Sequence, residues 1–109
     1  MIALGRNRQQ AVFRAIAAPT RRQILNLLRG REHTVGEIAA NFRMTRPAVS
    51  KHLRLLRAAG LVVTQKEGTQ RICALNAKPL RAVGDWLRNY ETFWGDSLRG
   101  LKRYVEEGR

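Results

Sequence analysis

The spacing of apolar residues changes period twice along this chain of 109 residues. Apolar residues recur every three or four positions over residues 9–59, form two β-prone runs over 61–75, and return to helical spacing over 77–107. A period near 3.6 is typical of a helix packed on a core, whereas β-branched runs around a turn are typical of a hairpin. The pattern therefore predicts a mainly α-helical domain with one small β-hairpin before its last helix.

Prolines and capping residues divide the first helical part into short helices. Pro19 suits the first turn of a helix, so it separates a helix over 9–17 from a second helix that Gly30 ends. Thr34 and Glu37 have the spacing of a capping box, in which each side chain accepts a hydrogen bond from the other residue's backbone N–H. A helix of about eight residues is expected to follow this box.

A further helix is predicted between Thr45 and Gly60. Thr45 is a candidate N-cap, Pro47 lies in the first turn, and Gly60 suits the left-handed residue that ends many helices. The apolar side of this helix, expected to face the core, carries Val49, Leu53 and Leu56.

The hairpin and one long helix complete the predicted fold. Leu61–Thr64 and Arg71–Leu75 are the β-prone runs, with Glu67 and Gly68 expected at the turn. The apolar spacing after residue 76 predicts a single C-terminal helix over 77–107.

The composition excludes several classes of protein. A hydrophobic fraction of 44% is too high for a disordered basic tail, and the chain lacks the run of roughly 18 apolar residues that a membrane span needs. The first residues are too few for the hydrophobic part of a signal peptide. The single cysteine cannot form an internal disulfide, which favours a reducing, cytoplasmic compartment. The length fits one domain over residues 1–109.

The net charge of +13 is distributed unevenly. Residues 1–31 carry seven bases and no acid, and residues 43–71 carry seven bases against Glu67 alone. Residues 72–109 carry seven bases against five acids and are close to neutral. Codon bias toward arginine explains why 17 of the 21 bases are Arg, but it does not explain this distribution. The pattern therefore predicts a polyanion as partner.

Two short helices joined by a tight turn and followed by a hairpin have the order of a winged helix-turn-helix, with residues 34–59 as the helix-turn-helix and 61–75 as the wing. The second helix is polar on the side opposite Val49 and can lie in the major groove of DNA. Its first turn would present Arg46 to guanine O6 and N7, and Ser50 to several bases. The residues expected to contact DNA are Thr45, Arg46, Pro47, Ser50, Lys51, His52 and Arg54 on the helix, and Lys66, Gln70 and Arg71 on the hairpin.

Less specific interpretations compete at several of these positions. A basic helix face can simply be solvated, and hairpins often carry exposed bases for solubility alone. His52 lies at the edge of the polar side, where it can pack between helices or bind a phosphate. Cys73 is expected to be a half-buried packing residue rather than a redox switch, since the chain has no second thiol.

Aromatic residues gather at helical spacing in the last helix, at Trp86, Tyr90, Phe93 and Trp94. They suit a core cap, a ligand cage or a dimer interface, and the length of the helix favours the interface. The last helix, over 77–107, is therefore expected to form the interface of a homodimer. On this helix the residues expected at the interface are Leu87, Tyr90, Trp94, Leu98 and Leu101.

The segments Pro19–Leu28, Phe42–Val62 and Glu67–Asn76, with the tryptophan-containing last helix, strongly resemble the ArsR family of bacterial repressors in order and spacing. The resemblance covers about 90 residues. It implies a homodimer that binds an inverted-repeat operator in double-stranded DNA and represses its own operon. The resemblance also implies dimerisation through the first and last helices, over 9–17 and 77–107. The first helix would add Val12, Phe13 and Ile16 to the expected interface. An unknown small-molecule effector is a further candidate partner, and the sequence does not show its chemistry.

The chain departs from the family at the metal site. Metal-sensing members carry a Cys-Val-Cys-Asp-type signature where this chain has Thr34, Val35, Gly36 and Glu37. Soft-metal sites need several Cys or His ligands, and the chain offers only Cys73, His33 and His52. No metal and no cofactor are therefore expected. Ala18 also replaces the capping Asp that members often have before Pro19.

Catalysis has no support in the sequence, because no Ser/His/Asp set, glycine-rich phosphate loop or carboxylate pair has a recognisable spacing. The expected function is sequence-specific DNA binding by a transcriptional regulator. The charge alone would also permit a non-specific nucleoid-like or RNA-binding module. A winged-helix domain that binds proteins would instead have an acidic or apolar recognition face.

Overall fold

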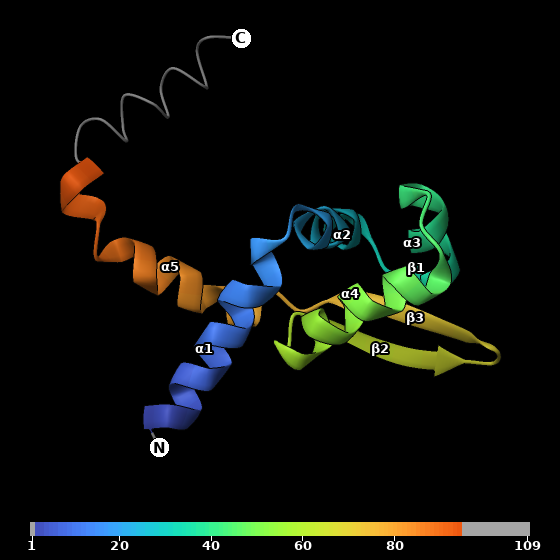
Figure 1. Ribbon diagram of the computed structural model, residues 1–109, viewed down its shortest axis with the longest axis horizontal. Coiled ribbons are helices and arrows are strands. Elements are labelled where there is room, and N and C mark those ends of the chain that lie inside the picture. Colours follow the sequence, from blue (N-terminus) through green and yellow to red (C-terminus); the bar gives the residue numbers. More distant parts are fainter. Residues whose placement is uncertain (1, 95–109) are drawn as a thin grey trace, which may run out of the picture.

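The computed structural model describes the backbone of residues 2–94 and the side chains of residues 7–94. Its elements in chain order are α1 (Ile2–Ala17), α2 (Pro19–Gly30), β1 (His33–Thr34), α3 (Val35–Phe42), α4 (Arg46–Ala58), β2 (Val62–Glu67), β3 (Gln70–Leu75), the 3₁₀ turn η1 (Lys78–Leu80) and α5 (Arg81–Arg88). Helices α2, α3 and α4 pack against the sheet, while α1 and α5 lie side by side at the end away from the hairpin tip (Figure 1). None of the described helices has the length and apolar character to cross a membrane.

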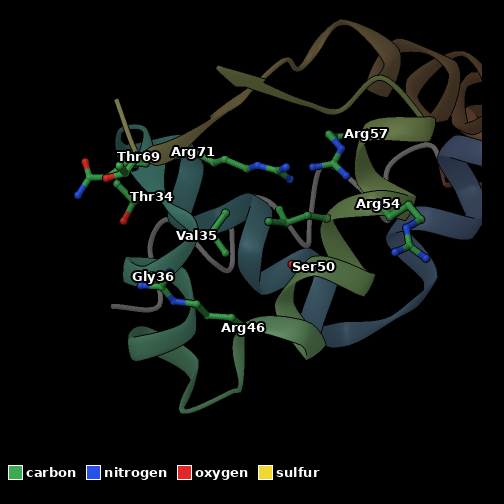
Figure 2. A pocket seen from close by; sticks show the side chains of 11 residues that line it. Thr34, Val35, Gly36, Arg46, Ser50, Arg54, Arg57, Thr69 and Arg71 are labelled. Atoms are coloured by element: carbon green, nitrogen blue, oxygen red, sulfur yellow. The ribbon is translucent and has the colours of Figure 1, made fainter. Parts of the chain in front are cut away.

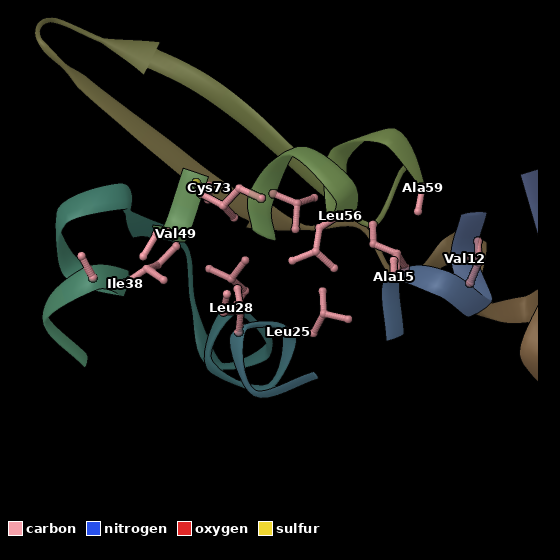
Figure 3. Packing of buried hydrophobic residues seen from close by; sticks show 14 residues of the cluster. Val12, Ala15, Leu25, Leu28, Ile38, Val49, Leu56, Ala59 and Cys73 are labelled. Carbon is pink, nitrogen blue, oxygen red and sulfur yellow. The ribbon is translucent and has the colours of Figure 1, made fainter. Parts of the chain in front are cut away.

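The buried residues confirm the inward face predicted for α4. Val49, Leu53 and Leu56 are each at most 1% exposed. They pack with buried residues of every layer, as Figure 3 shows: Leu25 and Leu28 of α2, Ile38 of α3, and Cys73 of β3. This shared core fixes the angle between α3 and α4, so it positions the outer face of α4.

The predicted caps are present at both helices of the helix-turn-helix. The Thr34 Oγ1 accepts a hydrogen bond from the Glu37 backbone N–H at 3.1 Å, and Glu37 Oε1 accepts one from the Thr34 N–H at 2.8 Å. Thr45 Oγ1 accepts from the Ala48 N–H at 3.3 Å. Gly60 follows the last turn of α4 with φ +78°, in the left-handed region that its lack of a Cβ favours.

The turn between α3 and α4 contains a feature that the sequence did not indicate. Arg43 adopts left-handed backbone angles, φ 52° and ψ 45°, although it is not a glycine. The next residue, Met44, returns its N–H to the Ala39 carbonyl at 3.0 Å and so closes the end of α3. A side chain in this region costs free energy, because Cβ crowds the carbonyl that follows it.

The sheet has one strand more than the predicted hairpin, in the order β1–β3–β2. The extra strand is only His33 and Thr34, which pair with Cys73 and Ile72 of β3. Two residues are too few to show the alternation of apolar and polar side chains that is typical of a strand, so apolar spacing could not reveal this one.

The hairpin is longer than predicted and turns one residue later. Glu67 pairs with Gln70, so the turn consists of Gly68 and Thr69 instead of Glu67 and Gly68. Gly68 has φ +59°, as expected for a two-residue hairpin turn that follows the twist of its strands. The strands therefore carry the hairpin tip past the ends of the helices (Figure 1).

The prediction of a single helix over 77–107 is wrong within the described residues. After η1, helix α5 ends at Arg88, and the Tyr90 N–H bonds to the Leu87 carbonyl three residues back, at 2.9 Å. Residues 91–94 are helical again. Neither proline nor glycine stands at this interruption, so the sequence gives little indication that the helix is interrupted here. At the other end of the chain, α1 begins at Ile2, earlier than the predicted residue 9.

Candidate nucleic-acid interface

The outer face of α4 carries most of the residues expected to contact DNA. Capping by Thr45 and packing of the opposite side hold this face outward. Its exposed residues are Thr45, Arg46, Pro47, Ser50, Lys51 and Arg54. The two ion pairs among the described residues, Arg31–Glu37 at 3.6 Å and Arg88–Asp85 at 3.1 Å, do not involve α4 or the hairpin. The positive charge of this face is therefore not neutralised from within the described part of the chain.

The hairpin places a second set of polar residues near the same face. Lys66, Gln70 and Arg71 are exposed next to the turn. They lie where β2 and β3 project beyond the helices (Figure 1).

A groove of about 380 Å³ joins α4 to the hairpin and to the first turn of α3. Four arginines line it, together with Ser50, Thr69 and Gln70. Figure 2 shows Arg57 and Arg71 pointing toward one another from opposite walls of this groove. Arg57 was missed as a site residue in the sequence, although Ser50, Arg54 and Arg57 follow one another at spacings of four and three along one side of α4.

Arg46 lies over the first turn of α3. A Cβ built on Gly36 would lie 2.8 Å from Arg46 Nη2, so the absence of a side chain at Gly36 makes room for the guanidinium (Figure 2). Among the residues that the structure describes, no group of three or more His, Cys, Asp or Glu is placed to hold a metal ion.

His52, another predicted DNA-contact residue, turns toward the start of α2. Its Nδ1 lies 3.4 Å from Arg21 Nη1, and the Arg21 guanidinium also donates to the Ala15 carbonyl at 2.7 Å. The half-buried ring therefore packs between α4 and the start of α2. This is the first of the two alternatives that the sequence left open.

Cys73 is fully buried, more than the half-burial expected for it. Burial raises the pKa of its thiol, so the thiol stays protonated at neutral pH. Its position opposite His33 in the sheet makes it a packing residue of the core.

A strip of aromatic side chains follows α1 and α5. Phe13 and Trp86 form an edge-to-face pair with ring centroids 5.5 Å apart, and Trp86 and Tyr90 form another at 5.2 Å. Phe93 extends the strip and is 79% exposed. Pairs of this kind stabilise a surface that still leaves much apolar area in contact with water.

The residues predicted at the dimer interface differ in how the structure places them. Leu87 and Tyr90 are exposed, and Phe13, Ile16 and Trp94 are partly exposed. Val12 is only 3% exposed and packs in the core of its own protomer, so it has no free surface for a partner. Leu98 and Leu101 lie outside the described residues.

Comparison with known proteins places these features in a family. A family model for bacterial regulatory proteins of the arsR family matches residues 18–64. The transcriptional repressor SdpR of Bacillus subtilis is 38% identical over 79 residues, which are 72% of this chain and 88% of that protein.

Two solved structures share the fold. A crystal structure of an ArsR family transcriptional regulator is 36% identical with a TM-score of 0.73, over 81% of this chain and 91% of that chain. A homodimeric winged helix-turn-helix DNA-binding domain from Mycobacterium bovis is 28% identical with a TM-score of 0.68, over 84% of this chain and 87% of that chain. The chain therefore belongs to the ArsR family of bacterial transcriptional regulators and has their winged helix-turn-helix fold.

Proposed function

We propose that this protein is a homodimeric repressor that binds an inverted-repeat operator in double-stranded DNA and controls its own operon. The observation that carries the proposal is the outer face of α4, which is exposed, basic and free of acidic residues. Val49, Leu53 and Leu56 bury the opposite side of the helix in the core, so the exposed residues of the outer face are available to a partner. A single helix of this kind fits the major groove of B-DNA.

Within this proposal, the first turn of α4 contacts the bases of the DNA and the hairpin contacts the sugar-phosphate backbone of the DNA. Arg46 and Ser50 stand at the N-terminal end of α4, the part of a recognition helix that reaches base edges. Lys66, Gln70 and Arg71 on the hairpin are suited to phosphates and to the adjacent minor groove. Such phosphate contacts would add affinity without preference for sequence.

The aromatic strip supports the homodimer. Trp86, Tyr90 and Phe93 leave exposed apolar surface that a second copy would cover, and aromatic residues are favoured at interface cores. The similar domain from Mycobacterium bovis is homodimeric. A two-fold dimer would present two copies of α4 and so require two half-sites in inverted orientation.

Repression by the relative from Bacillus subtilis supports the same direction of control here. A repressor of its own operon would act in the cytoplasm, where bacterial DNA lies. The small-molecule effector stays a prediction, and the functions of the neighbouring genes would indicate its class.

DNase footprinting on the protein's own promoter tests the proposal. We expect protection of an inverted repeat with half-sites about one helical turn apart, and reduced transcription from that promoter when the protein is added. Uniform protection along the promoter would instead favour a non-specific nucleoid-like module, and equal affinity for RNA would favour an RNA-binding module. Protection of the repeat with increased transcription would show an activator.

A further inference from the structure

We propose that the groove between α4 and the hairpin is a phosphate-binding site, in which Arg57 and Arg71 hold one backbone phosphate of the bound DNA. The inference rests on the proposed function. It assigns a ligand to the space between α4 and the hairpin, and neither of these elements forms that space alone.

The lining of the groove has the chemistry of an anion site. Arg46, Arg54, Arg57 and Arg71 supply guanidinium groups, while Ser50, Thr69 and Gln70 supply neutral donors. The lining includes no carboxylate. Arginine donates several N–H groups in a planar fork that matches the oxygens of a phosphate.

Arg57 and Arg71 converge even though both are cations. Figure 2 shows their side chains directed at one another, one from the last turn of α4 and one from the start of β3. Neither guanidinium takes part in the hydrogen bonds or ion pairs found among the described residues. Burial raises the pKa of the Cys73 thiol in β3, and the positive charges of Arg57 and Arg71 oppose this effect, so both guanidinium groups lie near that residue. Two like charges that face one another across the groove repel, and an anion between them would remove the repulsion.

The geometry of DNA explains why the anion would be a backbone phosphate. A sugar-phosphate strand separates each major groove from the adjacent minor groove. If α4 lies in the major groove and the hairpin tip reaches the minor groove, that strand must pass between the two elements. The groove lies at that crossing, and its volume of about 380 Å³ is larger than one phosphate needs, so a strand segment can enter it.

We call the pair Arg57 and Arg71 the clamp. The variants Arg57→Gln and Arg71→Gln test it in the full-length protein. Each variant should bind the operator and random DNA about tenfold more weakly, in equal proportion, because a phosphate contact carries no base information. The slope of log Kd against log salt should fall by about one. The double variant should lose little more than either single variant, since both arginines hold the same phosphate. Arg29→Gln, an exposed arginine of α2 outside the groove, is the matched control and should change neither affinity nor slope.

A second measurement identifies the source of the phosphate. Single operator phosphates can be replaced by uncharged methylphosphonates. At one position per half-site, the replacement should lower the affinity of wild type about tenfold and leave the affinity of the double variant unchanged. In the free protein, inorganic phosphate should shift the backbone amide resonances of residues 69–71 and 54–57 more than chloride does at equal ionic strength. The double variant should lose that shift.

The clamp would be refuted if both single variants kept the affinity and the salt slope of wild type. A changed base preference in either variant would also refute it. A phosphate response in the free protein without any sensitive operator position would overturn the DNA source and assign the groove to a free phosphate ligand. Wild-type protein that protects no inverted repeat would refute the proposed function instead, and the phosphate titration would still test the groove.

Discussion

Arg46 and Lys66 are two exposed cations from which we expect different effects on DNA binding. Arg46 stands in the first turn of α4, whereas Lys66 lies on the hairpin next to its turn. Arg46→Ala should weaken operator binding by about 1–3 kcal/mol and random DNA much less, because a lost guanine contact relaxes specificity. Lys66→Ala should weaken both DNAs alike. Competition binding at one salt concentration measures both effects, and equal losses for Arg46→Ala would exclude base reading by that residue.

Arg43 offers a prediction about stability at a single position. Its φ of 52° is favourable for glycine and costly for other residues. Arg43→Gly should raise the free energy of unfolding by about 0.5–1 kcal/mol, whereas Arg43→Ala should not, because alanine keeps the Cβ. Urea unfolding at fixed protein concentration measures both variants. A destabilised glycine variant would show that the left-handed turn does not strain the native chain.

At the scale of the element, α3 depends on its capping box. The hydrogen bond from the Thr34 N–H, with the charge of Arg31, lowers the pKa of Glu37 below its usual value. A lowered native pKa stabilises the fold above the unfolded pKa, and this stability is lost as the pH falls through the native value. Glu37→Gln keeps a hydrogen-bond acceptor but removes the charge. The Tm of wild type should exceed that of the variant at pH 7, and the two should converge well below pH 4. A constant difference across this range would exclude the charge as its cause.

Most elements could be predicted because their signals are local. Thr34, Thr45 and Gly60 mark helix ends through hydrogen bonds and backbone angles that depend on a few neighbouring residues. The strand at His33 and Thr34 could not be predicted, because it exists only by pairing with β3 far along the chain. The left-handed Arg43 carries no signal either, since its residue type does not favour that conformation.

The candidate site was predicted in part for a similar reason. The polar side of α4 follows from helical spacing around Val49, so its residues could be named from the sequence. The groove depends on how far Arg71 of the hairpin lies from Arg57 of α4, which only the tertiary packing determines. The contact of His52 with Arg21 is also tertiary, and spacing alone left its orientation open.

For the molecule as a whole, the proposed dimer would determine how the charge meets DNA. Two chains of +13 would carry +26, concentrated away from the nearly neutral C-terminal part. The aromatic strip lies on α1 and α5, at the opposite end of the protomer from the hairpin tip (Figure 1). Pairing through this strip would therefore leave both copies of α4 and both hairpins free for DNA.

Phe93→Asp tests that arrangement, because Phe93 is 79% exposed and its replacement should not disturb the core of the protomer. Light scattering should return about 25 kDa for wild type and 12.4 kDa for the variant. Val63→Asp is the matched control on β2, where the side chain is 50% exposed and outside the strip, and it should remain a dimer. A wild-type mass of one chain at micromolar concentration would refute the dimer.

The ratio of two affinities shows whether the face of α4 reads a specific sequence. Wild-type protein should be titrated at physiological salt with its footprinted repeat and with a scrambled duplex of equal length and composition. The repeat should bind at least about 10³-fold more tightly, because the base contacts of sequence-specific regulators supply a difference of this size. Affinities within tenfold of each other would contradict this expectation and leave only the non-specific binding that the net charge can supply.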